Sequence, residues 1–272
     1  MTRAILGCHA GGIPDNYPPQ GSYDPAFWTS RLIKLRCNVY NYLINAKDSW
    51  DFLLKWLEHT RKNPPFDFWI DLRGFLVGQE SYPHGIDFPK WGREIANLSR
   101  TYPHVTGFSI EDFCLAQAEE MQMLVDRRLE ITKNMMQECW RTNPKMQFFP
   151  VVYPSTIPLV ELCKDHVSGV IYYNWASKED LVAAKTVFPR KKVVAGIYAK
   201  CGGKENPAQY VKKCMLTANA YADGMMIFNV PENDPESPIG QVVTNLFSQW
   251  NPAKTLRAHT FRKLLGRGFI IT

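Results

Sequence analysis

The sequence predicts a single (β/α)8 TIM barrel, an α/β fold of eight parallel strands that alternate with eight helices. Short runs of β-forming residues alternate with amphipathic helical stretches along the chain. Eight such units occupy roughly 250 residues, the usual size of this fold. The runner-up, a doubly wound open sheet, requires a glycine-rich phosphate-binding turn after the first strand. The chain has His-Ala-Gly-Gly there, which lacks the GxGxxG spacing.

The predicted strands are short, rich in Val, Ile, Tyr and Phe, and bounded by turn-forming residues. In chain order they cover residues 3–9, 38–44, 66–72, 105–110, 146–153, 168–174, 192–198 and 225–230. Pro150 lies inside the fifth strand, where it weakens the prediction because proline donates no hydrogen bond to a sheet.

The predicted helices follow from apolar periodicity and from capping residues. Asp24-Pro25 has the form of an N-cap with proline in the first turn, and Ser177 with Asp180 forms a capping box. The helices cover residues 25–36, 48–62, 88–100, 115–141, 159–165, 177–187, 207–222 and 239–250. We expect the barrel to occupy about residues 3–250, and a basic helical tail to occupy about 251–272, within one domain.

Composition narrows the function classes. The 272 residues carry a formal charge of +6 that is spread along the chain, so we expect no nucleic-acid partner. No apolar run approaches the roughly 20 residues that cross a bilayer, and we expect no membrane partner. A strand-like segment begins by Ala4, and we therefore expect no signal peptide. The seven cysteines are irregularly spaced without a CxxC pair, which predicts reduced thiols in a cytoplasmic protein.

Chemistry in this fold lies at the C-terminal ends of the strands and in the loops that follow them. The polar and aromatic residues at these positions are His9, Asn41 or Asn45, Asp71, Arg73, Glu111, Asp112, Tyr153, Tyr173, Asn174, Trp175, Tyr198, Lys200, Asn229 and Glu232. We take Glu111, Asp112 and Asp71 as candidate catalytic residues and the others as candidate substrate-binding residues. No metal-ligand spacing is visible, and no cofactor is predicted, although Mg²⁺ held by the three acids stays an alternative.

Glu111 and Asp112 are adjacent carboxyl groups at the end of the fourth strand. If both reach the site, their repulsion raises one pKa and places an acid beside a base. Alternatively, one faces the site and the other caps the next helix. Side chains alternate along a regular strand, so the outcome depends on whether the strand ends between them. If it does not, Glu111 is the inward acid, because it shares parity with Ser109 and Gly107.

Other strand-end residues allow two interpretations each. Asp71 and Arg73 share parity and can form a bidentate ion pair, either in the site or as a purely structural contact. His9 is a base, a ligand or a hydrogen-bonded wall residue. Lys200 and the following Gly202-Gly203 turn can bind an anion, and Lys200 is also a candidate Schiff-base nucleophile.

The remaining strand-end aromatics suit stacking against sugar rings, or else packing within the barrel. Tyr153, Tyr173, Trp175 and Tyr198 belong to this group. Tyr173 and Asn174 have opposite parity, so at most one of them points straight into a regular barrel.

The run Gly107 to Phe113, an apolar strand ending in two acids, resembles glycoside hydrolase barrels, and the O-GlcNAcase-type substrate-assisted hexosaminidases most nearly. That resemblance implies that Glu111, in place of the family's aspartate, orients the substrate acetamide. It also implies that Asp112 protonates the leaving oxygen.

We therefore expect an enzyme that acts on a small-molecule or oligosaccharide substrate, a carbohydrate or glycoconjugate, by carboxylate acid/base chemistry. The alternatives are a metal-independent lyase or isomerase of an anionic small molecule, and a non-catalytic sugar-binding barrel.

Overall fold

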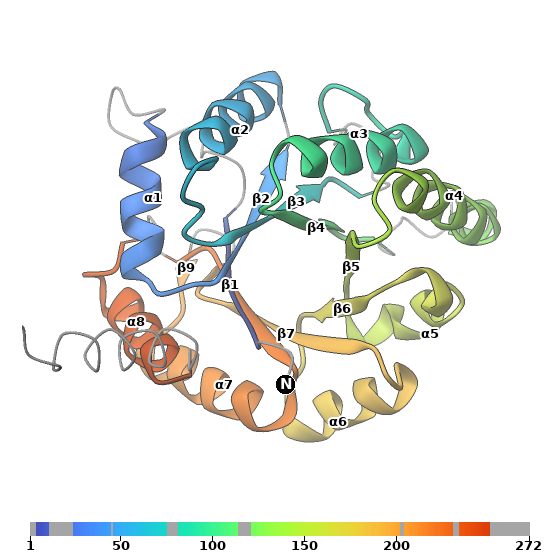
Figure 1. Cartoon of the computed structure of the whole chain (residues 1–272). Helices are drawn as coiled ribbons and strands as arrows, with labels where there is room; N and C mark the ends of the chain where they lie inside the picture. The colour runs from blue at the N-terminus through green and yellow to red at the C-terminus, as the bar shows by residue number, and fades with distance from the viewer. Residues whose placement is uncertain are drawn as a thin grey trace, which may run out of the picture.

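The computed structural model describes residues 4–10, 24–44, 46–74, 81–113, 121–201, 204–230 and 234–250. Within them, eight parallel strands form a closed barrel in the order β1-β10-β7-β6-β5-β4-β3-β2, which confirms the predicted (β/α)8 class. Figure 1 looks along the barrel, with the helices in a ring outside the strands.

The barrel strands lie close to their predicted positions. They are β1 (Ile5–Ala10), β2 (Val39–Ile44), β3 (Asp67–Leu72), β4 (Val105–Ile110), β5 (Gln147–Val152), β6 (Gly169–Tyr172), β7 (Lys192–Tyr198) and β10 (Gly224–Phe228). Pro150 is accommodated within β5, where it is in register with Ile110 of β4. The fifth strand is therefore present despite its proline.

The helices follow the strands in alternation. They are α1 (Pro25–Lys34), α2 (Lys47–Thr60), α3 (Phe88–Thr101), α4 (Met121–Thr142), α5 (Ile157–Glu161), α6 (Lys178–Val187), α7 (Ala208–Tyr221) and α8 (Pro238–Trp250). Their starts are fixed by local chemistry: the Asp24 carboxylate accepts the Ala26 amide, and the Asp87 carboxylate accepts the Lys90 amide.

Two details differ from the prediction. The expected helix 159–165 is α5 followed by a short 3-10 helix, Lys164–His166. An unpredicted antiparallel hairpin, β8 (Lys200–Cys201) with β9 (Lys204–Glu205), follows β7. The expected tail helix, and the start of the helix predicted from residue 115, lie outside the described residues.

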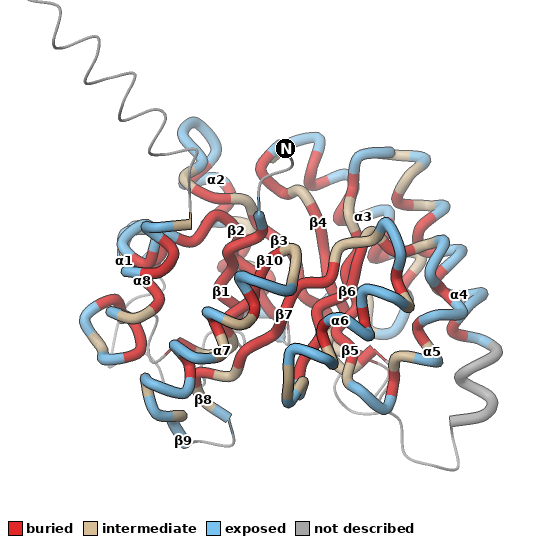
Figure 2. Tube along the Cα trace, turned by 90° about the horizontal axis from the view of Figure 1, so that it is seen from below, coloured by how far each residue is buried: buried red, intermediate tan, exposed pale blue. Residues whose placement is uncertain are grey.

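The apolar core has two layers. The larger fills the space between the strands and the helices, and the smaller fills the barrel interior around Trp69, Phe149, Ile171 and Tyr173. In Figure 2 the strands form the buried centre, and exposure is confined to the outer elements. Inward-facing side chains alternate along every strand, so the last inward position of each strand reaches the barrel mouth.

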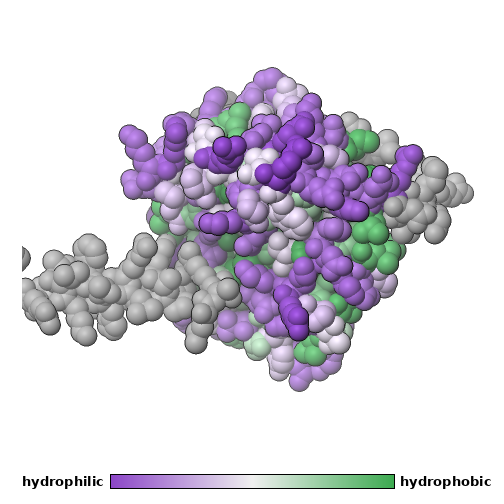
Figure 3. Space-filling model, turned by 45° about the vertical axis from the view of Figure 1, so that its right-hand side comes forward, coloured by the Kyte–Doolittle hydropathy of each residue, from purple (hydrophilic) through white to green (hydrophobic). Residues whose placement is uncertain are grey.

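One face of the molecule is mainly polar. The face seen in Figure 3 is mostly hydrophilic, with hydrophobic side chains scattered over it. Among the described helices, none is both long and apolar enough to cross a membrane.

Candidate active site

The centre of the site is the buried carboxylate of Asp71 at the end of β3. Its Oδ2 lies 2.8 Å from His9 Nε2 on β1, and both side chains are almost completely buried. Its Oδ1 accepts a hydrogen bond of 2.5 Å from Ser109 Oγ on β4. Burying a carboxylate is costly unless it is paired, and these two contacts supply the pairing.

Asn41 on β2 completes this buried network. Its Oδ1 lies 3.0 Å from Ser109 Oγ, and its side chain is fully buried. Ser109 has one hydroxyl proton, and the charged Asp71 oxygen is the stronger acceptor for it. Four neighbouring strands thus fix the orientation of one carboxylate.

Glu111 lies one inward position beyond Ser109, at the mouth. Its backbone amide donates to Leu72 carbonyl, so the pairing with β3 persists to this residue. Its Oε2 lies 3.0 Å from Arg73 Nη1, and its side chain is 15% exposed. Burial, followed by the charge of Asp71, raises the pKa of Glu111 to about 7, although His9 and Arg73 oppose the rise.

Asp112 is where the strand geometry ends. Its φ of 50° lies in the left-handed region, which aspartate tolerates better than most residues. Its Oδ1 accepts a 2.5 Å hydrogen bond from the Tyr153 hydroxyl beyond β5. The break between the two acids therefore lets both carboxyl groups face the mouth, and Asp112 contributes to the raised pKa of Glu111.

The turn is also shaped by a glycine. A Cβ atom on Gly74 would lie 2.3 Å from the Glu111 carbonyl oxygen, so the chain leaving β3 passes directly against the chain leaving β4. Asn174 and Asn229, at the ends of β6 and β10, have φ of 57° and 54°. Left-handed backbone thus recurs at three strand ends of the mouth, a location where such conformations often serve a site.

Three tyrosines, Tyr153, Tyr173 and Tyr198, contribute to the site from the ends of β5, β6 and β7. The Tyr173 hydroxyl lies 3.5 Å from His9 Nδ1, and its ring packs 4.8 Å from that of Tyr198. The ring fits because Gly196 has no side chain; a Cβ there would lie 2.4 Å from it. Burial raises the pKa of Tyr198 to about 12 and raises that of Tyr153 further, so both remain neutral hydroxyls at neutral pH.

The structure brings only some of the predicted strand-end residues together, and their pairing differs from the prediction. Arg73 pairs with Glu111, and Asp71 pairs with His9, which replaces the Asp71–Arg73 pair that shared parity suggested. Asp71 and Asn41 are fully buried beneath Glu111, which places them behind the surface that a substrate meets.

Other predicted residues have separate surroundings. Tyr173 is buried and Asn174 exposed, in agreement with strand alternation. The Trp175 indole donates to Gly196 carbonyl at 2.9 Å, which anchors its ring. Lys200 lies in the β8–β9 hairpin, and Asn229 follows β10. Asn45, Gly202, Gly203 and Glu232 lie outside the described residues.

Sequence reasoning missed two contributors. Phe228 at the end of β10 packs edge-on against His9 with a ring separation of 4.7 Å. From the sequence, Ser109 only indicates the parity of Glu111, but its hydroxyl is the hydrogen-bond donor to Asp71. Strand parity could have identified both residues, because each faces the barrel interior at the same level as a predicted site residue.

The same residues include a set of metal-ligand types. One ligand atom each from His9, Asp71 and Glu111 lies within 4.8 Å of the others. These groups suit a divalent ion chemically. In this arrangement, however, His9 Nε2 already lies against the Asp71 carboxyl, and the Arg73 guanidinium lies against that of Glu111.

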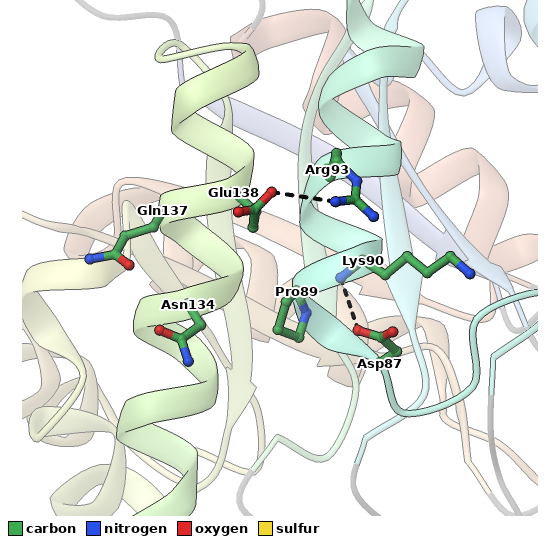
Figure 4. A pocket seen from close by; sticks show the side chains of 7 residues that line it. All are labelled: Asp87, Pro89, Lys90, Arg93, Asn134, Gln137 and Glu138. Atoms are coloured by element: carbon green, nitrogen blue, oxygen red, sulfur yellow. Dashed lines mark hydrogen bonds and ion pairs between the residues drawn. The ribbon is translucent and has the colours of Figure 1, made fainter.

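A separate cavity of about 360 Å³ lies on the outside of the barrel between α3 and α4. Figure 4 shows its lining: Asp87, Pro89, Lys90, Arg93, Asn134, Gln137 and Glu138. Arg93 lies 3.7 Å from Glu138, and Asp87 caps α3, so several of these polar groups serve the packing of the helices. None of the strand-end residues lines this cavity.

Comparison with known proteins finds solved structures with a similar fold. No protein-family description and no curated protein sequence matches the chain. Bacteroides uniformis β-glucuronidase 2 superposes with a TM-score of 0.60 at 10% identity, over 83% of this chain and 30% of that one. The PgaB (BpsB) glycoside hydrolase domain of Bordetella bronchiseptica gives 0.58 at 10%, over 85% and 97%.

A third solved structure carries a different activity in its name. Oxaloacetate acetylhydrolase in complex with oxalate gives a TM-score of 0.53 at 13% identity, over 99% of this chain and 84% of that one. The chain spans only about 30% of the length of the β-glucuronidase. Identities this low establish fold alone. The chain therefore shares its TIM-barrel fold with glycoside hydrolases.

Proposed function

We propose that this protein is a glycoside hydrolase that cleaves a carbohydrate or glycoconjugate with Glu111 and Asp112. The observation that carries the proposal is the placement of two adjacent carboxyl groups at one barrel mouth with different partners. Glu111 is largely buried beside Arg73, while Asp112 accepts a hydrogen bond from Tyr153. Glycosidic cleavage uses two carboxyl groups in different roles, which different surroundings provide.

Glu111 is the better proton donor of the two. A pKa of about 7 leaves roughly half of its carboxyl groups protonated at neutral pH, while the other half can accept a proton. That range suits a group that protonates the leaving oxygen of a glycoside. This assignment reverses the roles that the resemblance to O-GlcNAcase-type enzymes implies for Glu111 and Asp112.

Asp112 then supplies the negative partner. The transition state of glycoside cleavage carries positive charge near the anomeric carbon, which a nearby carboxylate stabilises. The Tyr153 hydrogen bond orients this carboxylate. Tyr153 and Tyr198 are partly exposed at the mouth and provide aromatic faces for a sugar ring.

A panel of aryl glycosides tests the proposal. We expect at least one to be cleaved, and Glu111→Gln and Asp112→Asn each to lower kcat/KM by about 10²–10⁴-fold. Glu179→Gln, at an exposed glutamate in the first turn of α6, is the matched control and should keep full activity. Full activity in both active-site variants would sink the proposal.

The same panel separates the alternatives. Turnover of sugar phosphates without turnover of aryl glycosides would favour a lyase or isomerase. Saturable binding of oligosaccharides without any turnover would favour a non-catalytic sugar-binding barrel.

A further inference from the structure

We propose that His9, Asp71 and Glu111 form a binding site for a divalent transition-metal ion of the Zn²⁺ type, and that the bound ion inhibits turnover. The metal-free protein is then the active form. The inhibitory effect rests on the proposed function, in which Glu111 donates a proton to the substrate. The binding site itself rests on the geometry of the three side chains.

The floor of the site contains two buried polar atoms that have no hydrogen-bond partner among the described residues. They are His9 Nε2 and Asp71 Oδ2, whose side chains are 1% and 0% exposed. The two atoms lie 2.8 Å apart, but without the alignment of a hydrogen bond. Nearly all buried polar atoms in proteins have a hydrogen-bond partner. Two such atoms side by side are therefore suited to a ligand that both can bind.

The spacing of the three side chains fits one small cation. One ligand atom from each lies within 4.8 Å of the other two. Two atoms that each lie about 2.1 Å from one Zn²⁺ are about 3–3.5 Å apart at neighbouring coordination positions. The His9–Asp71 pair is already close to that spacing. Glu111 is 15% exposed at the mouth, and a small inward movement of its carboxylate completes the set.

The other atoms of the two buried ligands are held by their neighbours. Asp71 Oδ1 accepts the Ser109 hydroxyl at 2.5 Å, while Oδ2 faces His9. His9 Nδ1 lies 3.5 Å from the Tyr173 hydroxyl, and the Phe228 ring packs 4.7 Å from the imidazole. Metal-binding histidines and carboxylates commonly have such outer partners, which orient their ligand atoms toward the ion.

The ligand types favour one class of ion. An imidazole nitrogen with two carboxylates suits Zn²⁺ and similar transition metals, whereas Mg²⁺ and Ca²⁺ prefer oxygen ligands. Such an ion opposes the proposed reaction in two ways. Its bond to Glu111 occupies the carboxyl group that donates the proton. Its positive charge also raises the energy of a transition state that is itself positively charged.

Zinc titration tests the site without reference to activity. Full-length protein is dialysed against EDTA, transferred to a buffer without chelator and titrated with Zn²⁺ by isothermal calorimetry. We expect a single saturable site. Ser109→Ala, which removes an outer partner, should weaken the affinity about 10- to 100-fold. His9→Gln and Asp71→Asn, each of which removes a ligand, should weaken it further.

Two controls separate this site from other side chains that bind zinc. His104→Gln changes another buried histidine, which lies 3.0 Å from Thr60 Oγ1, and Cys201→Ser changes an exposed thiol in the β8–β9 hairpin. Both variants should bind Zn²⁺ as tightly as the wild type.

Folding failure does not remove the test. If His9→Gln and Asp71→Asn do not fold, Glu111→Gln decides, because its side chain lies at the mouth rather than on the floor of the site. Weakened zinc binding in the folded ligand variants supports the inference. Wild-type affinity in those variants overturns it.

Turnover separates the two proposals. We expect Zn²⁺ to inhibit aryl-glycoside cleavage over the concentrations at which it binds, and EDTA to restore the rate. Unchanged or faster turnover at saturating zinc overturns this inference. Zinc binding that depends on His9 and Asp71, in a wild type that cleaves no glycoside, overturns the proposed function only. Glycoside turnover that requires Glu111, without zinc binding, overturns this inference only.

Discussion

Arg73 Nη1 lies 3.0 Å from Glu111 Oε2, so the carboxyl with the raised pKa also has a cationic partner at the barrel mouth. The guanidinium stabilises the ionised form and offsets part of the cost of burial. Removing the Arg73 guanidinium should therefore show how far it lowers the pKa of Glu111.

We predict that Arg73→Gln moves the basic limb of the kcat/KM profile upward by about one pH unit. Without the guanidinium, the Glu111 pKa rises and the acid form persists to higher pH. The pH dependence of initial rates measures the shift. Arg93→Gln is the control, because Arg93 pairs with Glu138 on the outer helices and should leave the profile unchanged. A basic limb that stays in place, or moves down, would contradict the prediction.

The raised pKa of Glu111 also predicts how stability depends on pH. The folded protein holds this proton up to about pH 7, whereas an unfolded glutamate releases it near 4.5. Between these values the folded state binds more protons, so the free energy of unfolding falls as pH rises. Glu111→Gln has no carboxyl group to titrate at this position. Its free energy of unfolding, relative to that of the wild type, should therefore rise by about 2 kcal/mol between pH 5 and pH 8.

Chemical denaturation at the two pH values measures this difference. Glu179→Gln serves again as the exposed control and should track the wild type. A variant whose stability relative to wild type is the same at pH 5 and pH 8 would show that Glu111 is not protonated in the folded state.

The Tyr153–Asp112 contact predicts a selective loss of rate. Tyr153→Phe removes the hydroxyl that donates to Asp112 at 2.5 Å but keeps the aromatic face. We expect kcat to fall about 10- to 100-fold with a smaller change in KM, because the carboxylate loses its orienting partner. Tyr42→Phe removes a hydroxyl that donates to Ser49 carbonyl and should affect stability but not kcat. Equal losses of kcat in both variants would contradict a specific role.

The left-handed backbone at Asp112 predicts that a substitution can change turnover and stability separately at this position. Asn tolerates a φ of 50°, so Asp112→Asn should keep wild-type stability while losing turnover. Asp112→Val places a β-branched residue in that conformation and should lower the free energy of unfolding by about 1–3 kcal/mol. Urea denaturation compares the two; a Val variant as stable as the Asn variant would argue against strain at this turn.

Metal removal gives a further prediction. Because His9 and Arg73 already lie against the two carboxyls, we expect dialysis against EDTA to leave turnover within about twofold of the untreated protein. Activity that is lost on dialysis and restored by a divalent ion would instead assign His9, Asp71 and Glu111 as its ligands.

The sequence by itself determined the barrel. Alternating apolar patterns, capping residues such as Asp24 and turn residues between segments are local signals, and they located strands and helices to within a few residues. Strand parity also separated the buried Tyr173 from the exposed Asn174, which lie just beyond β6. These features depend on neighbours in the chain, which a sequence contains directly.

Only the tertiary structure decided the partners within the site. Asp71 and Arg73 share parity, yet their side-chain partners are His9 on β1 and Glu111 just after β4, because these contacts form between strands that the closed barrel brings together. The turn at Asp112 depends equally on the chain passing at Gly74. Glu111 and Asp112 were visible as two acids ending a strand, but their different surroundings arise from side chains 38 and 41 residues away. Electrostatic fields follow distance in space, and no local pattern records them.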